Sequence, residues 1–472
     1  MLASPRSTLR RLLSPSELRE MAALAAPAVL VQVGLMAMGV ADTVMAGHLS
    51  ATTIAAVALG NLYVFILCVG GLGTLLALDP LVSQAVGAGD EPAIARAVQR
   101  GLGIAVAISV LVSLVLWPAE SVLRAARQPA DVVPEAARFA RASIPGVLPF
   151  FWFAVLRSVL QALGRMRPIV VAVIVGNVLN VALNWVLMFG NLGSPRLGAA
   201  GSAWSSSIGR WVMLATLAVS AAAALRPHLS PARADAWRPA ALARTVRLGV
   251  PIGVQQLLEV SAFGGVTLLM GLFGTVPLAG HEIALNLASL TFMVPFGVST
   301  AAAVLVGRSV GAGDAESARW HAASAVACGV AFMTLSAATF VVAPTLLARA
   351  YTADPAVLAV TATLLPIAGA FQLFDGVQAV SAGVLRGAGD TYAPMLANLV
   401  GFWLLGIPAG ALLAFRAALG PAGLWWGLVI GLAAVATLLL ARVRSRLSRS
   451  IARVDVERAR PARDAALSTI DG

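Results

Sequence analysis

The feature that most constrains this chain is a series of long apolar runs. An α-helix needs about 20 predominantly apolar residues to cross the hydrocarbon core of a bilayer. We identify about twelve runs of this kind, near residues 22–46, 53–78, 101–118, 139–163, 168–190, 199–224, 248–273, 280–306, 323–347, 357–384, 393–414 and 422–441. Hydrophobic residues make up 59% of the chain and charged residues only 11%. The sequence therefore predicts an all-α integral membrane protein with twelve transmembrane helices and argues against a soluble globular fold.

Basic residues are sorted between alternate loops. The formal net charge of +12 would indicate a nucleic-acid partner in a soluble protein, but loops that carry basic residues stay in the cytoplasm when a membrane protein inserts. If the amino terminus is cytoplasmic, 25 of the 33 basic residues fall in cytoplasmic segments, seven fall outside, and Arg210 lies within the sixth run. We therefore expect both termini in the cytoplasm and no nucleic-acid partner.

Several kinds of chemistry are excluded by residue usage. All the basic residues are arginine, whereas a Walker P-loop and a Schiff-base enzyme both need lysine. Any transport would therefore not use an ATPase within this chain. The two cysteines and four histidines lack metal-ligand spacing, so we expect no disulfide framework, no metal site and no cofactor.

The chain contains an internal duplication. The segment Val86–Asp90, Val-Gly-Ala-Gly-Asp, recurs as Val310–Asp314, an offset of 310 − 86 = 224. Six helices return a chain to its starting side, so the second half enters the membrane in the same orientation and the repeat is parallel. We expect an amino-terminal segment, a first six-helix bundle, a linker, a second six-helix bundle and an Arg-rich tail, at 1–21, 22–225, 226–247, 248–441 and 442–472.

The repeated glycine-rich segments are best explained as turns. Their glycines suit a tight turn, and Asp90 and Asp314 are placed to cap the helices that follow. Asp79, which precedes Pro80, is interpreted in the same way, as a cap or turn residue near a helix end. The tail is interpreted as a solvated, partly disordered segment.

Three carboxylates lie well inside apolar runs: Asp42, Glu259 and Asp375. An ionised carboxylate near the centre of a membrane helix costs roughly 2.5 to 3.5 kcal/mol on insertion scales. Such residues either fix helix packing through hydrogen bonds or face a central polar cavity. We favour the cavity, because a carboxylate that is costly to insert is better explained when it performs a function there.

Further polar residues share helical faces with these carboxylates. Spacings of three or four residues place side chains on one side of a helix. Such stripes are Gln255, Gln256 and Glu259; Gln372, Asp375 and Gln378; Asn177, Asn180 and Asn184; and Glu282 with Asn286, while Ser205, Ser206 and Ser207 lie in the sixth run. The glutamine and carboxylate stripes predict the lining of a polar cavity. The asparagines either line it too or bridge packed helices.

Four further segments carry a recognisable pattern: Met38–Gly47, which contains Asp42; Leu248–Pro251, which leads to Glu259; Gly280–Asn286; and Phe374–Gln378 with Gly383–Gly387. These segments resemble the multidrug and toxic compound extrusion family, in its NorM-like bacterial branch, and the resemblance extends over about residues 15–445. Two positions depart from the pattern. Residue 184 is Asn where some relatives carry Asp, and residue 282 is Glu where many carry Gln.

The resemblance implies a V-shaped pair of bundles around a central cavity, in the bacterial inner membrane, that exchanges organic cations for Na⁺ or H⁺ by alternating access. Hard oxygen ligands around Asp42 would suit either an alkali cation or a proton, so the coupling ion stays open. We expect a monomer that binds cationic drugs and lies in the lipid bilayer. The candidate coupling-ion residues are Asp42, Asn180, Asn184, Ser206, Glu259 and Asp375, and the candidate substrate residues are Glu259, Asp375, Gln256, Gln378, Glu282 and Asn286.

Two other functions are compatible with parts of this pattern. A lipid-linked oligosaccharide flippase of the same superfamily would share the two-bundle plan, but its cavity would be rich in cations that bind phosphate. A membrane-embedded transferase would need a convergent nucleophile, base and oxyanion donor, and the duplicated helices offer no such set.

Overall fold

A computed structural model describes residues 15–448 and 452–457, and every regular element in these residues is helical. The first half contains α2 (Pro15–Gly47), α3 (Ala51–Leu75), α4 (Leu78–Gly87), α5 (Glu91–Leu116), α6 (Ala119–Ala125), α7 (Val133–Ser143), η1 (Ile144–Gly146), α8 (Val147–Ala162), α9 (Arg167–Leu187), η2 (Asn191–Gly193), α10 (Ala199–Ser220) and α11 (Ala222–Leu229). A short 3-10 segment, η3 (Ala234–Trp237), lies between the halves.

The second half begins with α12 (Pro239–Gly271) and continues with α13 (Thr275–Gly311), α14 (Ala315–Val342), α15 (Pro344–Arg349), α16 (Pro355–Gly387), α17 (Tyr392–Asn398), η4 (Leu399–Gly406), α18 (Ile407–Ala411), η5 (Leu412–Arg416) and α19 (Gly420–Ser448). Here η4 and η5 are π-helical segments, so the eleventh predicted span is irregularly wound.

The described residues contain eleven helical stretches long and apolar enough to span a bilayer, and a bent pair gives a twelfth. In that pair, α10 and α11 meet at an angle of 90° at Ala221. The chain is thus a multi-pass membrane protein, and the predicted fold class of twelve helices in two six-helix halves is confirmed.

Several helices extend beyond the apolar runs that predicted them. Helix α12 begins at Pro239, so the last part of the expected linker 226–247 is helical. At the two ends of the chain, α2 begins at Pro15 and α19 continues to Ser448. The bilayer thickness limits the length of an apolar run but not the length of the helix, whose polar turns continue outside the hydrocarbon.

The two glycine-rich turns have the predicted geometry. Gly89 and Gly313 have φ angles of +63° and +75°, which an L side chain adopts with strain. The carboxylates of Asp90 and Asp314 then accept hydrogen bonds from the amides of Ala93 and Ser317, at 3.0 and 2.9 Å. The prediction that each Asp caps the next helix is confirmed.

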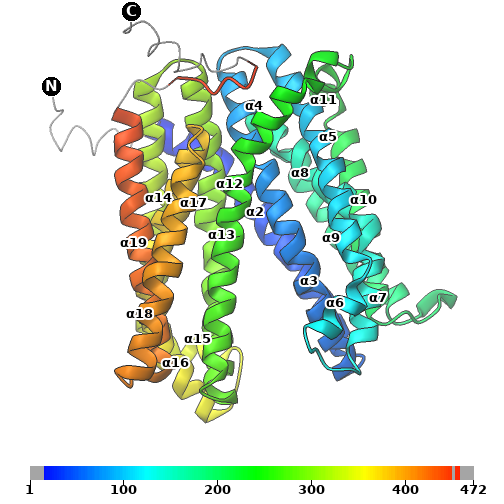
Figure 1. The fold of residues 1–472 in the computed structure, drawn as a ribbon, viewed down its shortest axis with the longest axis vertical. Coiled ribbons are helices and arrows are strands. Elements are labelled where there is room, and N and C mark those ends of the chain that lie inside the picture. Colours follow the sequence, from blue (N-terminus) through cyan, green and yellow to red (C-terminus); the bar gives the residue numbers. More distant parts are fainter. Residues whose placement is uncertain (1–14, 449–451, 458–472) are drawn as a thin grey trace, which may run out of the picture.

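The two halves form a V (Figure 1). They lie against each other at the end of the molecule where α2 begins and α19 ends, which we call the termini face, and they diverge toward the opposite end. Helix α13 packs against α2 and α4, while α12 packs against α3. These pairs join the halves along what we call the seam.

Glycines allow the closest approach across the seam. A Cβ atom on Gly87 would collide with the carbonyl oxygen of Arg308, and a Cβ atom on Gly311 would collide with that of Gln84. Both relations follow the repeat, because Gly87 and Gly311 are 224 residues apart, as are Gln84 and Arg308. The pseudo-two-fold axis therefore passes between α4 and α13.

An ion pair also crosses the seam. Asp79 on α4 is 5% exposed, and its carboxylate lies 3.2 Å from the guanidinium of Arg386 on α16. Asp79 lies in the first turn of α4, near a helix end as predicted, but the cap position belongs to Ala77 and the Asp79 side chain joins the two halves. The sequence did not reveal this because the partner lies in the other half of the chain.

Candidate functional site

A first polar cluster surrounds Asp42 in the first half. Asp42 lies on α2 and is only 3% exposed. Its Oδ1 atom accepts hydrogen bonds from the side-chain amides of Asn184 at 2.6 Å and Asn180 at 3.2 Å, and its Oδ2 atom accepts one from the Ser206 hydroxyl at 2.8 Å. The structure thus brings together four of the predicted residues from three helices. We call them the Asp42 cluster.

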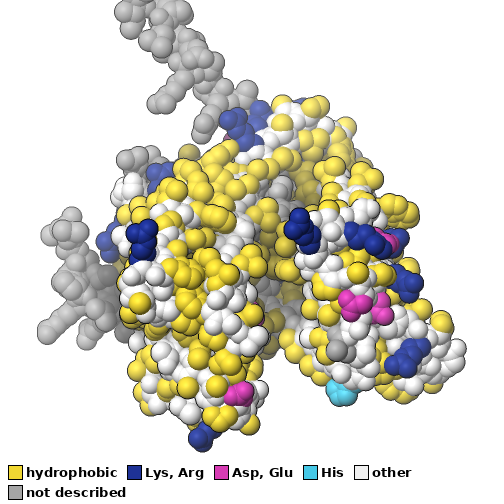
Figure 2. Space-filling view, turned by 60° about the horizontal axis from the view of Figure 1, so that its bottom comes forward, with side chains coloured by type: hydrophobic (Ala, Val, Ile, Leu, Met, Phe, Trp, Pro, Cys, Tyr) yellow, Lys and Arg dark blue, Asp and Glu magenta, His cyan; other side chains and the backbone are white. Residues whose placement is uncertain are grey.

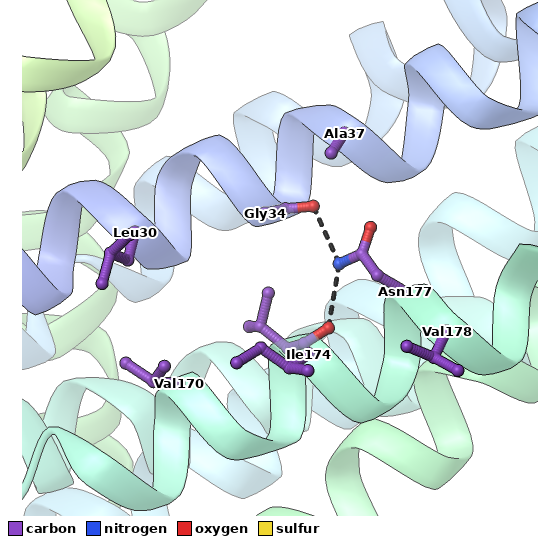
Figure 3. A pocket seen from close by; sticks show the side chains of 8 residues that line it. Leu30, Gly34, Ala37, Val170, Ile174, Asn177 and Val178 are labelled. Atoms are coloured by element: carbon purple, nitrogen blue, oxygen red, sulfur yellow. Dashed lines mark hydrogen bonds between the residues drawn. The ribbon is translucent and has the colours of Figure 1, made fainter.

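The spacing of the asparagines explains their different partners. Asn180 and Asn184 lie one turn apart on α9 and are fully buried toward Asp42. Asn177, one turn earlier, donates instead to the carbonyl oxygens of Gly34 and Val173, both at 2.9 Å (Figure 3). Asn177 therefore bridges α2 and α9, which is one of the two roles considered for the stripe.

Figure 3 also shows that an apolar groove lies between α2 and α9 beside Asn177. Its lining is aliphatic apart from that amide, with Leu30 and Ala37 on α2 and Val170, Ile174 and Val178 on α9. The polar contacts of α9 are thus confined to one face, and the neighbouring face suits lipid or apolar side chains.

One residue near Asp42 was missed. Ser202 lies one turn before Ser206 on α10, is completely buried, and its side chain is close enough to interact with the Asp42 carboxylate. By contrast, the hydroxyls of Ser205 and Ser207 donate to the backbone carbonyls of Gly201 and Ala142. A spacing of four residues from Ser206 was the signal that would have identified Ser202.

A second polar cluster lies in the other half around two carboxylates. The Oε2 atom of Glu259 on α12 accepts hydrogen bonds from the side-chain amides of Gln378 on α16 at 3.3 Å and Asn398 on α17 at 3.2 Å. Asp375, one turn before Gln378, is 5% exposed and lies close enough to Glu259 for the two charges to interact. These residues form what we call the Glu259 cluster.

The Glu259 cluster is rich in acceptors and poor in donors. The amide oxygens of Gln378 and Asn398 are buried without a hydrogen-bond partner among the described residues, as are those of Gln372 and Gln256. Buried oxygens of this kind are costly unless they meet a proton or a cation. Two carboxylates with unpaired amide oxygens around them therefore offer hard oxygen ligands for a monovalent cation, or sites for protons.

Asn398 was also missed by sequence reasoning. It is fully buried at the end of α17, where it is the only amide residue in the eleventh apolar run. A lone asparagine forms no stripe, so periodicity gave no signal. Its position inside an apolar run was the available clue, because a buried amide in a membrane helix needs a partner.

Three other predicted substrate residues stand apart from this cluster. Gln256 lies one turn before Glu259 on α12 and is half-buried. Glu282 and Asn286 are exposed near the start of α13, and the phenol of Tyr351 donates to the Asn286 side-chain oxygen at 3.0 Å. Among the described residues, no hydrogen bond connects Glu282 or Asn286 with the two carboxylates. They lie nearer the open end of the V, where α13 begins.

His281, which sequence reasoning set aside, is completely buried. Its Nε2 atom lies 3.0 Å from the Thr267 hydroxyl, and its ring meets that of Trp425 edge-on, with centroids 5.7 Å apart. These contacts pack α13 against α12 and α19. No group of three or more His, Cys, Asp or Glu side chains in the described residues is arranged to hold a metal ion.

The molecule is hollowed between the two halves. Figure 2 shows the face away from the chain ends, where two lobes are separated by a cleft whose visible walls are mostly apolar. The charged side chains visible in this view gather mainly on the rims of the lobes. The Asp42 and Glu259 clusters belong to opposite lobes, on α2, α9 and α10 and on α12, α16 and α17.

The chain folds as two parallel six-helix halves that are joined at one face and open at the other, and each half contains buried carboxylates. This arrangement defines a membrane transporter rather than an enzyme. The comparisons with known proteins give the family. The family described as MatE matches residues 27–186 and 251–412, and these two regions start 251 − 27 = 224 residues apart, the offset of the repeat. The chain therefore belongs to the MatE family, and the resemblance found in the sequence is confirmed.

Curated relatives support this assignment over nearly the whole chain. The chain is 39% identical over 436 residues to the probable multidrug resistance protein NorM of Mesorhizobium japonicum, covering 90% of this chain and 93% of that protein. It is 36% identical over 445 residues to the multidrug resistance protein MdtK of Yersinia pseudotuberculosis, covering 91% and 95%. The NorM-like bacterial branch is thus shown.

A solved structure supports the fold. The crystal structure of a eukaryotic MATE transporter superposes with a TM-score of 0.84 at 22% sequence identity, covering 92% of this chain and 98% of that one. An outward-facing multidrug resistance MATE family transporter superposes with a TM-score of 0.83 at 18% identity, covering 93% and 97%.

Proposed function

We propose that this chain is a secondary active multidrug efflux transporter that exchanges organic cations for Na⁺ or H⁺ by alternating access. The observation that carries the proposal is the Glu259 cluster, in which two carboxylates and unpaired amide oxygens lie together inside a membrane-spanning half. The names of the NorM and MdtK relatives as multidrug resistance proteins support a drug substrate.

Bulky organic cations fit the surroundings of Glu259. Phe263 lies one turn after Glu259 on α12, is half-buried, and packs against Phe371 and Phe402 with ring centroids 5.9 and 5.8 Å apart. Aromatic faces attract cations, and their apolar surface favours large ligands. A cation beside Glu259 would therefore find charge from two carboxylates and contact area from the rings. Gln256, Gln378, Glu282 and Asn286 would form the further polar contacts on the substrate path.

The Asp42 cluster is proposed to bind the coupling ion. A side-chain amide can present either its nitrogen or its oxygen, so Asn180 and Asn184 can donate to Asp42 when the site is empty and present oxygens when a cation is bound. With Ser206 they would then surround Na⁺ with oxygen, whereas a proton would bind Asp42 itself. Glu259 and Asp375 are candidate sites for the coupling ion as well, in competition with the drug.

Exchange requires that drug and ion favour different orientations of the two halves, because a ligand that binds both orientations equally shifts no equilibrium. The structure is open away from the termini face and closed at the seam. We propose that both termini are cytoplasmic, that the membrane is the bacterial inner membrane, and that the open cleft faces outward. Since one chain contains both halves and the cleft, we propose that a monomer is the working unit, without a nucleic-acid partner.

Arginines at the seam argue against a lipid-phosphate substrate. Arg386 is paired with Asp79, and the guanidinium of Arg308 donates to the carbonyl oxygen of Ala162 at 2.7 and 2.9 Å. Both cations therefore already have partners, while the unpaired buried amide oxygens of the Glu259 cluster favour a positively charged ligand. This supports drug export over a lipid-linked oligosaccharide flippase.

The test is transport in proteoliposomes with a fluorescent organic cation such as ethidium. A Na⁺ gradient and an H⁺ gradient are imposed separately, and export is followed for the wild type, Glu259→Gln and, as a control, Glu120→Gln, which changes a carboxylate on α6 whose side chain is 40% exposed. We expect one gradient to drive export, Glu259→Gln to abolish it, and Glu120→Gln to leave it unchanged. No export under either gradient, or undiminished export by Glu259→Gln, would reject the proposal.

A further inference from the structure

A short part of the tail lies across the termini face. Residues 452–457, which we call the strap, follow α19 and run from the second half toward α4 (Figure 1). Their side chains are not all solvated: Val454 and Val456 pack against the hydrophobic core. The interpretation of the tail as a solvated segment is therefore wrong for these residues. The Arg-rich composition concealed two valines that alternate with charged side chains.

The beginning of the strap binds the first half. The guanidinium of Arg453 lies 3.0 Å from the carboxylate of Asp90, and the Val454 amide donates to the Oε1 atom of Gln84 at 2.7 Å. Gln84 is fully buried, and its Nε2 atom donates across the seam to the carbonyl oxygen of Gly387 at 2.8 Å. One side chain thus connects α4, α16 and the strap.

The middle of the strap binds the second half. The Val454 side chain contacts Gly389 in the turn between α16 and α17, where a Cβ atom would collide with it. The guanidinium of Arg244 on α12 donates to the carbonyl oxygens of Val456 at 2.6 Å and Glu457 at 3.2 Å. Because the strap is also joined covalently to α19, these contacts hold it as part of the second half.

The end of the strap returns to the first half. The Glu457 carboxylate lies 2.9 Å from the guanidinium of Arg100 and 3.3 Å from that of Arg96, both on α5. Arg100 is only 1% exposed, so removal of its carboxylate partner would leave a buried cation with one remaining hydrogen bond, to the carbonyl oxygen of Ala236. Charged pairs of which one member is buried are far less screened than pairs on the surface.

We propose that the strap is a conformational latch that holds the termini face closed and so stabilises the outward-open orientation. Opening the cleft on the termini face would separate the first half from the second and would break the contacts of Arg453, Val454 and Glu457 with Asp90, Gln84, Arg96 and Arg100. The latch acts only on the closed seam, so it shifts the equilibrium between the two orientations. It also gives the carboxyl terminus of the chain a means of regulating transport.

The test measures the seam directly and needs no substrate. Spin labels are placed at Arg165→Cys in the first half and Ala312→Cys in the second, both exposed on the termini face, after Cys68 and Cys328 are replaced by alanine. Pulsed electron paramagnetic resonance in nanodiscs then gives the distribution of distances between them. The intact chain is compared with a chain that ends at Ser448 and with the single variant Glu457→Gln.

We expect the chain that ends at Ser448 to gain a longer-distance population, with the ratio of long to short distances raised on the order of fivefold or more, and Glu457→Gln to give a smaller shift in the same direction. The matched control is Asp390→Asn, which removes an ion pair with Arg442 at 2.7 Å inside the second half alone. It should leave the distribution unchanged. If the truncated chain does not fold, Glu457→Gln and Val454→Asn decide the question.

Unchanged distances in Glu457→Gln and Val454→Asn would overturn the latch, whatever the truncated chain does, because these contacts would then not control the seam. A shift in Asp390→Asn equal to that in Glu457→Gln would overturn it too, since loss of any ion pair on this face would then suffice. Neither outcome depends on the identity of the substrate or coupling ion.

Discussion

The two polar clusters differ in how far each satisfies its own carboxylate. Asp42 accepts three side-chain hydrogen bonds, from Asn180, Asn184 and Ser206, so its negative charge is solvated by the protein. Glu259 accepts two, at 3.3 and 3.2 Å, lies close to a second carboxylate, and has unpaired amide oxygens around it. Among the described residues the first cluster leaves the amide oxygen of Asn184 unpaired, whereas the second leaves those of Gln378 and Asn398 unpaired beside two carboxylates, so its need for a positively charged ligand is greater.

This difference teaches that the duplication preserved the scaffold and not the chemistry. At the repeat offset of 224, Asp42 corresponds to Val266 and Glu259 corresponds to Leu35. The seam, by contrast, retains its symmetry, with Gly87 and Gly311 making equivalent contacts. The halves therefore share the surfaces on which they move and differ in what they bind, which is what coupled transport of two unlike ligands needs.

After Glu259→Gln, the largest effect is expected at Asp375. In Asp375→Asn the Glu259 cluster loses one of its two charges and gains amide hydrogens, so it no longer attracts a cation strongly. We expect drug export to fall by on the order of 100-fold, with drug binding reduced as well. Equilibrium binding of the fluorescent cation and export from proteoliposomes measure the two quantities. Retained binding with lost export would contradict the assignment of Asp375 to the drug site.

A smaller and different effect is expected at Asp42. Asp42→Asn keeps the shape of the site but removes its charge, and the donors from Asn180 and Asn184 then compete with a new amide. We expect coupled export to fall about tenfold while drug binding stays unchanged, because the drug site is in the other half. A second variant, Asn184→Asp, adds a negative charge beside Asp42 and should raise the affinity of this cluster for the coupling ion. Equal losses of binding in Asp42→Asn and Asp375→Asn would remove the distinction between the clusters.

Much of the Asp42 cluster could be predicted from the sequence. A carboxylate inside an apolar run is conspicuous because of its insertion cost. The four-residue spacing of Asn180 and Asn184 places both on one face of α9. Which asparagine bridges helices and which reaches Asp42 depends on how α2 and α9 cross, and spacing alone does not contain that information. Asn177 and Asn180 are only three residues apart, yet their partners differ.

The missed features share a physical cause. Asn398 is a single polar residue without a periodic pattern, and the partner of Asp79 lies about 300 residues away along the chain. The strap was missed because an Arg-rich segment of low hydrophobicity is usually solvated, and its contacts depend on carboxylates and a buried arginine brought together by the closed seam. The length of an apolar run predicts a membrane-spanning helix well. Polar partners that are distant in the sequence can be identified only from the three-dimensional structure.

A more moderate effect is expected at Asn398. Asn398→Leu removes one of the two donors to Glu259 and also one unpaired amide oxygen. A hydrogen bond to a charged group contributes about 1.5 kcal/mol at the lower end of its range, so we expect drug affinity to change by roughly tenfold. Gln372→Leu, whose amide donates to the Thr291 hydroxyl instead, is the matched control and should change affinity less. A larger effect in the control would place the ligand away from Glu259.

The smallest effect is expected at the paired helix caps, of which the strap contacts the first, at Asp90. The hydrogen bonds from the Ser317 amide and hydroxyl hold the pKa of Asp314 below its ordinary value. This cap therefore stabilises the folded chain fully above the pKa of the unfolded state, about 3.9. The stabilisation is lost as the pH falls through the lower pKa of the folded state. Thermal unfolding of Asp314→Asn in detergent should therefore differ slightly from that of the wild type at pH 7 and converge with it in acid.

Asp90→Asn also loses the contact with Arg453, and should lower the unfolding temperature more than Asp314→Asn at pH 7. Equal shifts in the two variants would mean that the strap adds nothing to the cap of the first half.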